Sequence, residues 1–155
     1  MLVYVDTSVF GGVFDPEFER GSQALFEKIR DGRLRGAVSA LVADELARAP
    51  ARVSGLFTQL ESLFLRLDIG RRAYALRRAY LDAGVVGPRW AADALHVASA
   101  TVGGCRAIVS WNFRHIVNFQ RIPLYNAVNE IQGYSPIGIY TPLEMAFDED
   151  EEEEL

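Results

Sequence analysis

Cysteine, histidine and long hydrophobic runs are all scarce in this chain of 155 residues. Cys105 is the only cysteine, which excludes an internal disulfide and a cysteine-rich zinc cluster. The two histidines, His96 and His115, give little support to a histidine-rich zinc site. No apolar run approaches the roughly 20 residues of a membrane-spanning helix, and no basic segment followed by an apolar core indicates a signal peptide. We therefore expect no membrane association and a reducing, cytoplasmic setting.

Lysine is almost absent as well, and the charge is unevenly distributed. Only Lys28 among the 16 basic residues is a lysine, and the formal net charge is −5. Residues 148–155 include seven acidic residues, so residues 1–147 hold 14 acidic and 16 basic residues, a formal charge of about +2. Mutual repulsion in the acidic segment predicts a disordered tail at 148–155 after a single domain at 1–147. A mildly basic body is compatible with binding a polyanion such as RNA.

The pattern of apolar residues predicts strands that alternate with helices. Half of the residues are hydrophobic, which favours a globular domain with a sizeable core. Gly11-Gly12 and Asp15-Pro16 predict a loop after the first strand. We expect strands at residues 2–5, 36–39, 107–109 and 137–140, and helices at 19–31, 40–49, 53–67, 69–83 and 90–101. Strands separated by helices over such distances predict an α/β fold with a parallel sheet.

Three acidic residues lie in settings where a carboxylate is unusual. Asp6 directly follows the apolar residues 2–5, and Asp93 interrupts the apolar stretch 90–98. Glu45 lies in a predicted helix that is otherwise largely apolar. Burying a carboxylate among apolar residues is costly unless a cation or hydrogen-bond donors compensate it. We therefore expect the three side chains to converge on a metal ion, and a set of oxygen ligands suits Mg²⁺ or Mn²⁺ better than Zn²⁺.

Asp6 and Asp93 also have structural interpretations. Asp6 is equally suited to act as the N-cap of a helix that starts beside it. Asp93, His96 and Ser99 recur at every third position and would form one polar stripe on a helix. That stripe is typical of a metal ligand with supporting residues, but also of a buried Asp–His pair. We expect His96 to be structural or to support a ligand rather than to bind the metal itself.

Other polar residues lie close in sequence to these acids. Thr7 and Ser8 follow Asp6 and either support its carboxylate or a metal-bound water, or are ordinary turn residues. Arg89 and Arg114 are candidates for binding the phosphates of a nucleic-acid substrate, because arginine suits bidentate phosphate contacts.

Four segments, taken in order, resemble a known family: YVDTSV at residues 4–9, LVADEL at 41–46, DALHVASA at 93–100 and IVSWNFRH at 108–115. The chain is similar to the PIN-domain family, which includes the VapC-type toxin ribonucleases. This resemblance implies a PIN-like three-layer α/β/α sandwich with a central parallel sheet. It also implies a metal-dependent endoribonuclease that hydrolyses RNA, an antitoxin protein as partner and a homodimeric assembly. Of the neighbouring acids Asp44 and Glu45, the resemblance selects Glu45 as the site residue.

The fourth acidic position of the family is replaced in this chain. PIN domains commonly carry a further acid after the fourth strand, where this sequence has Ser110-Trp111-Asn112. Asn112 can offer a carbonyl oxygen to a hard cation but no charge. It is equally suited to cap a helix that starts near Phe113. This replacement leaves a second hypothesis open, in which the domain is a non-catalytic PIN-like module that binds RNA or serves as a scaffold.

Overall fold

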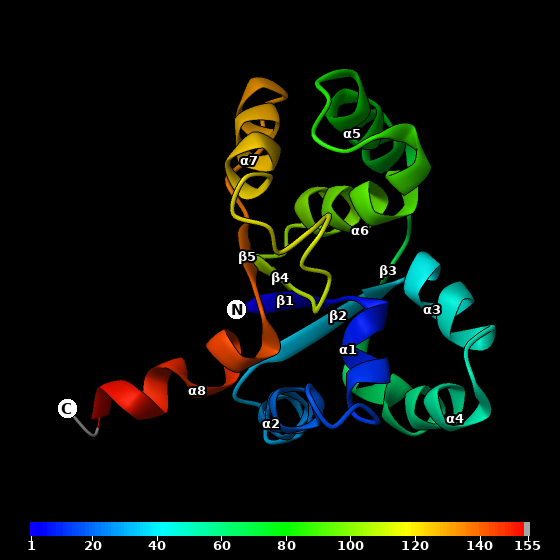
Figure 1. The fold of residues 1–155 in the computed structure, drawn as a ribbon, viewed down its shortest axis with the longest axis vertical. Helices are drawn as coiled ribbons and strands as arrows, with labels where there is room; N and C mark the ends of the chain where they lie inside the picture. Colours follow the sequence, from blue (N-terminus) through cyan, green and yellow to red (C-terminus); the bar gives the residue numbers. More distant parts are fainter. Residues whose placement is uncertain (154–155) are drawn as a thin grey trace.

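A computed structural model describes the backbone of residues 1–153 and the side chains of residues 1–147. Its centre is a five-stranded sheet with the strand order β3-β2-β1-β4-β5, in which all neighbouring strands are parallel (Figure 1). The strands are β1 (Leu2–Val5), β2 (Arg35–Ser39), β3 (Phe64–Leu67), β4 (Ala107–Val109) and β5 (Gly138–Tyr140). This confirms the α/β fold with a parallel sheet.

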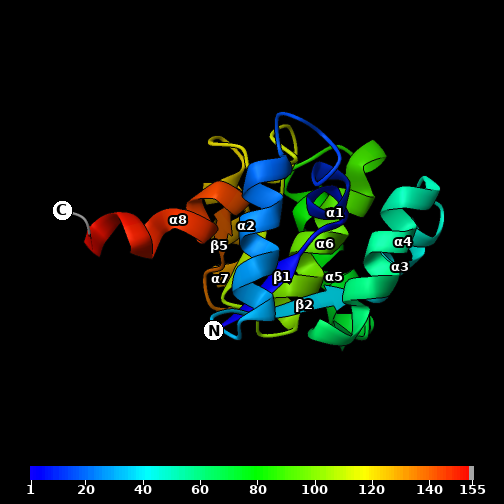
Figure 2. The same cartoon turned by 90° about the horizontal axis from the view of Figure 1, so that it is seen from below.

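The helices form a layer on each side of the sheet. One layer contains α5 (Arg71–Asp82), α6 (Ala91–Val102) and α7 (Ile122–Ile131). The other contains α1 (Thr7–Gly12), α2 (Glu19–Arg30), α3 (Ala40–Ala47), α4 (Ala51–Leu60) and α8 (Pro142–Glu153), which lie towards the viewer in Figure 2. Single 3₁₀ turns, η1 (Glu61–Leu63) and η2 (Pro88–Trp90), precede β3 and α6. The predicted three-layer α/β/α sandwich is confirmed.

The central strands are buried on both faces, as helices on both sides of a parallel sheet require. Residues 3–5 of β1 and 107–109 of β4 are almost fully buried. On the α1–α4 side, Phe10 packs against Phe26 with ring centroids 5.0 Å apart and edge-on against Phe57 at 5.4 Å. This rigid core fixes the ends of β1 and β4, where the candidate residues lie.

The prediction of one helix over residues 53–67 is wrong in its last part. The helix ends at Leu60, and residues 64–67 form the edge strand β3, which pairs with β2. The helical spacing of apolar residues continues through Leu63, Phe64 and Leu67, so periodicity alone could not detect the change. Packing decides it: the Phe64 ring covers Gly36, where an added Cβ would lie 2.7 Å from the ring.

Residues 11 and 12, predicted as loop, belong to helix α1. Gly12 is a glycine for reasons of space, since an added Cβ would lie 2.6 Å from both the Ser22 hydroxyl and the Trp111 ring. Helix α7 was not expected from the sequence. The remaining predicted strands and helices are present, with bounds shifted by a few residues.

The C-terminal segment forms α8, which packs against α2. The Arg20 guanidinium lies 5.1 Å from the Phe147 ring centroid, and Lys28 donates to the Met145 carbonyl at 3.4 Å. The backbone of residues 148–153 continues α8, where the sequence predicts disorder; glutamate has a high helix propensity. Residues 154 and 155, and the side chains from 148 onward, lie outside the described residues. Within the described part of the chain, no helix has the length and apolar character needed to cross a membrane.

Candidate functional site

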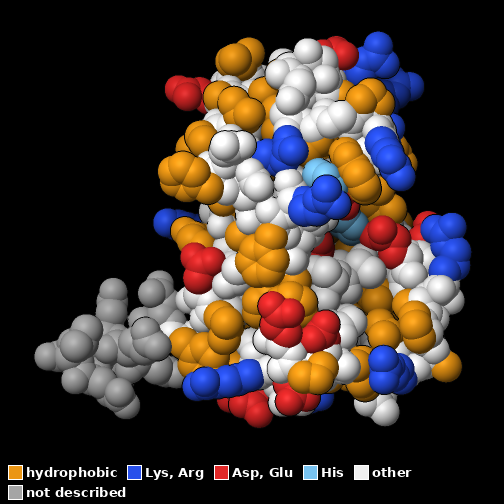
Figure 3. Space-filling view, in the orientation of Figure 1, with side chains coloured by type: hydrophobic (Ala, Val, Ile, Leu, Met, Phe, Trp, Pro, Cys, Tyr) orange, Lys and Arg blue, Asp and Glu red, His pale blue; other side chains and the backbone are white. Residues whose placement is uncertain are grey.

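The candidate residues gather at the carboxyl edge of the sheet, beside the end of β1. β1 lies between β2 and β4. The chain therefore adds β2 and β3 on one side of β1 first, and β4 and β5 on the other side later. Open α/β sheets bind ligands in the crevice at such a switch point. Asp6 follows β1, Ser39 ends β2 and Ser110 follows β4. In Figure 3, acidic, histidine and basic side chains surround a hollow in the middle of this face.

Asp6 is buried at this edge, with 4% of its surface exposed. It is the N-cap of α1: its Oδ1 accepts from the backbone N–H of Ser8 at 3.0 Å and from the Ser8 hydroxyl at 2.5 Å. Its Oδ2 accepts from the Ser110 hydroxyl at 2.9 Å. Burial raises the pKa of Asp6; the nearby charge of His96 and the bonds from Ser8 and Ser110 offset only part of that rise. The N-cap interpretation is therefore confirmed, and the carboxylate has no lysine or arginine partner among the described residues.

The loop after β4 is bound to the same carboxylate through its two serine partners. Ser8 accepts from the backbone N–H of Trp111 at 2.9 Å, and Ser110 accepts from that of Asn112 at 2.9 Å. Ser8 therefore supports the Asp6 carboxylate, which was one of the two interpretations of Ser8 from the sequence. Thr7 does not: its hydroxyl donates to Glu45 instead, at 2.7 Å.

Glu45 lies on α3 and is held by a histidine from α6. Its Oε1 accepts from His96 Nε2 at 2.6 Å and from Thr7. On the other side of the ring, His96 Nδ1 lies 2.8 Å from the Tyr4 hydroxyl, which lies 2.7 Å from the Ser39 hydroxyl. Burial alone would raise the pKa of Glu45, but the bond and charge of His96, with the Thr7 bond, hold it below its usual value.

Asp93 lies in the first turn of α6 and pairs with the second histidine. Its Oδ2 lies 3.1 Å from His115 Nδ1, and the His115 ring stacks on Trp90 with centroids 4.1 Å apart. The alternative of a buried Asp93–His96 pair is therefore not realised: His96 binds Glu45 and Asp93 binds His115. Ser99, the third member of the stripe, is buried, and its hydroxyl is without a hydrogen-bond partner in the described structure.

Three carboxylates influence the pKa of one buried imidazole. Burial alone would lower the pKa of His96, but the bond to Glu45 and the charges of Asp6, Glu45 and Asp93 raise it. Hydrogen bonds place the three acids at the same edge of the sheet: Thr7, next to Asp6, donates to Glu45, and His115, the partner of Asp93, lies in the loop that Ser110 joins to Asp6. Convergence of the three acids on a metal ion stays a prediction.

The donor set fits a hard divalent cation, although it is not arranged around one. In the described residues, no three acidic, histidine or cysteine side chains are already positioned as a metal site. Asp93 and Glu45 are each bound through one oxygen, which leaves Asp93 Oδ1 and Glu45 Oε2 without a protein partner among the described residues. Their side chains are 23% and 31% exposed. These two oxygens and the Asp6 carboxylate are oxygen ligands of the kind that Mg²⁺ and Mn²⁺ prefer, so the residue types fit such an ion, although their arrangement is not yet that of a metal site.

Comparisons with known proteins agree with this architecture. VapBC2 from Rickettsia felis, bound to a promoter DNA fragment, matches 91% of this chain and 98% of its own with a TM-score of 0.53 at 11% identity. FitAcB from Neisseria gonorrhoeae matches 90% and 97% with a TM-score of 0.56 at 16% identity. FitAB bound to the IR36 DNA fragment matches 91% and 95% with a TM-score of 0.56 at 15% identity. The chain has a PIN-like fold.

No family model and no curated protein sequence matches this chain. The likeness is thus one of fold.

Asn112 is placed as a cap rather than as a free ligand. Its Oδ1 accepts from the backbone N–H groups of Arg114 at 3.2 Å and His115 at 3.0 Å. The segment that it caps is a turn at 113–116 and not the helix expected there. The cap interpretation is confirmed, and binding a cation through Oδ1 would compete with these two bonds.

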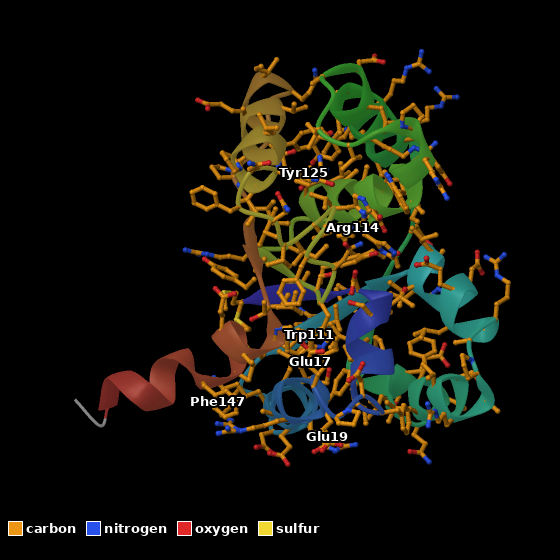
Figure 4. All side chains as sticks on the ribbon, viewed as in Figure 1. Glu17, Glu19, Trp111, Arg114, Tyr125 and Phe147 are labelled. Atoms are coloured by element: carbon orange, nitrogen blue, oxygen red, sulfur yellow. The ribbon has the colours of Figure 1, made fainter. Side chains whose placement is uncertain are left out.

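The two candidate arginines are both exposed, and both lie near the second histidine. The Arg89 guanidinium lies 5.3 Å from the Trp90 ring centroid, on the stack that holds His115. Arg114 precedes His115, and Figure 4 shows it in front of α6, on the opposite side of the sheet from Glu17. The site therefore has exposed positive charge at its edge and carboxylates within it.

Sequence reasoning missed three supporting residues: Tyr4, Ser110 and His115. Tyr4 lies in an apolar strand, where a tyrosine is an ordinary core residue and gives no signal. Ser110 contacts Asp6 across 104 positions, a pairing that depends on β1 lying beside β4. His115 lies in a segment that resembles the PIN family. Its contact with Asp93 could not be predicted, because the two residues are far apart in the sequence.

The buried charge of Asp6 predicts that Asp6→Asn stabilises the metal-free protein at neutral pH by a few degrees in melting temperature. Because the pKa of Asp6 is raised, the folded state holds the proton more tightly than the unfolded state does. Stability is then highest below the ordinary pKa of 3.8 and falls as the pH rises to the folded pKa. The asparagine variant lacks this loss, so its advantage over wild type should shrink towards pH 3.

Thermal unfolding of both proteins across a pH series, with chelator present, measures this effect. A lower melting temperature of the variant at pH 7 would show that the bonds from Ser8 and Ser110 to the ionised carboxylate outweigh the cost of burying it.

Proposed function

We propose that this chain is a metal-dependent endoribonuclease that hydrolyses phosphodiester bonds of RNA. The observation that supports the proposal is the buried Asp6 carboxylate at the switch point of a PIN-like sheet, with Glu45 and Asp93 held by hydrogen bonds at the same edge. Carboxylates are costly to bury without a cation, and Asp6 is almost fully buried. Ion binding explains a buried carboxylate of this kind better than a contribution to the stability of the fold does.

In this proposal Asp6, Glu45 and Asp93 hold Mg²⁺ or Mn²⁺, with Asn112 as an assisting group. The bound ion supplies an activated water and neutralises charge that develops on the phosphate. Ser8 and Ser110 fix the direction of the Asp6 carboxylate, and Thr7 and His96 fix that of Glu45.

The substrate side of the proposal rests on the exposed arginines. Arg89 and Arg114 bind phosphates of the RNA strand at the edge of the site, where neither is buried. Their guanidinium groups give bidentate contacts to phosphate oxygens. The phosphodiester and the carboxylates are both negatively charged and repel each other. The arginines next to the acids offset this repulsion and bring the phosphodiester to the site.

We further propose that the chain is the toxin of a toxin–antitoxin pair, with a cognate antitoxin protein as partner and a homodimer as its assembly. Support comes from the similarity of fold to VapBC2 and FitAB, whose structures both include DNA fragments. For this chain, RNA remains the proposed substrate.

A second candidate function is a non-catalytic PIN-like module that binds RNA or serves as a scaffold. The state of Asn112 favours it, because the family's fourth acid is absent and the Asn112 carbonyl already serves as a cap. Binding and cutting of RNA therefore have to be measured separately.

Cutting of a covalently closed, single-stranded RNA circle tests the proposed function, because only an endonuclease can linearise it. We expect linear product with Mg²⁺ or Mn²⁺ and no cutting of the corresponding DNA circle. Asp6→Asn purified in parallel controls for contaminating ribonuclease. Binding of the circle without any linear product under these conditions would instead support the non-catalytic module.

A further inference from the structure

A buried chain of hydrogen bonds connects the centre of the sheet to Glu45. It runs from Ser39 at the end of β2 to Tyr4 on β1, then to His96 on α6, and ends at Glu45 on α3. The successive distances are 2.7, 2.8 and 2.6 Å. Ser39, Tyr4 and His96 are all at most 2% exposed. The chain therefore ties the one partly exposed member, Glu45, to the rigid core.

The chemistry of the partners fixes most of the protons in this chain. An ionised carboxylate can only accept, so His96 Nε2 carries a hydrogen and donates it to Glu45. Burial raises the pKa of Tyr4, so its hydroxyl keeps its proton. In a neutral ring His96 Nδ1 accepts from the Tyr4 hydroxyl, and in a charged ring it donates to that hydroxyl; Nε2 carries a hydrogen in both cases. The Tyr4 hydroxyl thus holds the ring in the orientation that points Nε2–H at Glu45.

The result for Glu45 is that one oxygen is held and the other is presented. Oε1 takes both bonds, from His96 and from Thr7, while Oε2 makes none within the described part of the structure. The two donors come from α6 and α1, and together they restrict the rotation of the carboxylate. Asp93 shows the same arrangement, with Oδ2 on His115 and Oδ1 left without a protein partner among the described residues.

The hydroxyl of Tyr4 is not needed to fill space. The ring is fully buried in β1, and phenylalanine would occupy the same volume. A tyrosine there places a hydroxyl in the core, where it requires partners, and both partners lie on the route to Glu45.

We propose that Tyr4 and His96 are positioning residues that aim Glu45 Oε2 at the divalent cation, with Tyr4 acting through the orientation of the His96 ring. This inference rests on the proposed function, because the cation is the group at which Oε2 is aimed. Partners of this kind behind a metal ligand typically contribute about 10–100-fold in metal affinity.

The test compares Tyr4→Phe with Tyr80→Phe. Tyr80 is a matched control: it is also fully buried, and its hydroxyl donates to Asn129 on α7 rather than to a residue of the site. Three quantities are measured for wild type and both variants: the Mn²⁺ dissociation constant by calorimetry, kcat and KM for RNA cleavage, and the melting temperature. The imidazole ¹⁵N spectrum of the metal-free proteins is recorded as well.

We expect both variants to lose a few degrees in melting temperature, because each leaves a buried partner without its bond. Only Tyr4→Phe should weaken Mn²⁺ binding and lower kcat, each by about tenfold or more, with KM for RNA unchanged. Only Tyr4→Phe should shift the His96 Nδ1 resonance, because that nitrogen loses its hydrogen bond with the Tyr4 hydroxyl, while the His115 resonances stay in place.

Equal Mn²⁺ affinity and kcat in the two variants, with similar losses in melting temperature, would overturn the proposal and make Tyr4 a purely structural residue. An unshifted His96 spectrum in Tyr4→Phe would also overturn it. If wild type binds no Mn²⁺ and cuts no RNA while His96 responds as expected, the hydrogen-bond chain is supported and the proposed function fails.

Discussion

Asp93→Asn should lose RNA cleavage by about 100-fold or more while keeping its fold. The substitution preserves the volume of the side chain and can keep a contact with His115, but it removes the negative charge and one carboxylate oxygen. Removing even an indirect partner of a metal ligand costs about 10–100-fold, so losing a ligand should cost at least the upper end of that range. Glu45→Gln and Asp6→Asn should have effects of similar size for the same reason.

Helix α3 offers a matched control for the glutamate substitution. Asp44 precedes Glu45 and is exposed, and adjacent helical side chains point about 100° apart. Asp44→Asn removes the same charge one position away and should leave cleavage within about twofold of wild type, since surface charges act weakly through solvent. Initial rates on one RNA substrate, with circular dichroism of each variant, provide the measurement. Wild-type rates in a folded Asp93→Asn or Glu45→Gln protein would remove these residues from the site.

Removal of divalent metal should abolish cleavage completely and reversibly. Oxygen ligands bind Mg²⁺ and Mn²⁺ in fast equilibrium, so a chelator should strip the site without unfolding the protein. Activity should return on adding excess Mn²⁺ or Mg²⁺, while the protein without metal stays folded and loses only a few degrees in melting temperature, because the ion offsets the buried charge of Asp6 but the packing of the core does not depend on it. Undiminished cleavage by protein shown to be metal-free by elemental analysis would exclude this mechanism.

Asp6 and Asp93 could be proposed from sequence because each breaks a local pattern, whereas the family resemblance selected Glu45 over Asp44. Asp6 ends a strand and Asp93 interrupts an apolar helix, so the chemistry of both positions is visible in a few residues. Their partners could not be predicted in the same way. The Asp6–Ser110 contact depends on which strand lies beside β1, and that pairing forms between residues far apart in the chain.

His96 shows where helical periodicity misleads. Residues three apart share a face, which left a buried Asp93–His96 pair open as an alternative to a metal ligand with a supporting histidine. In the structure they lie one turn apart on α6 and reach different partners: His96 faces β1 and α3, while Asp93 meets the loop after β4. The same dependence on tertiary packing explains β3, where Phe64 continues an apolar helical spacing but is placed in the sheet by its contact with Gly36.

The central claim is that the carboxylates of this PIN-like site bind a divalent cation, and direct Mn²⁺ binding tests it. Electron paramagnetic resonance measures free Mn²⁺ as the ion is titrated into chelator-treated protein, without requiring any substrate. We predict saturable binding to wild type and to Asp44→Asn, and binding at least about 100-fold weaker in Asp93→Asn. Binding of equal strength in wild type and Asp93→Asn, or no saturable binding to wild type at all, would contradict the claim.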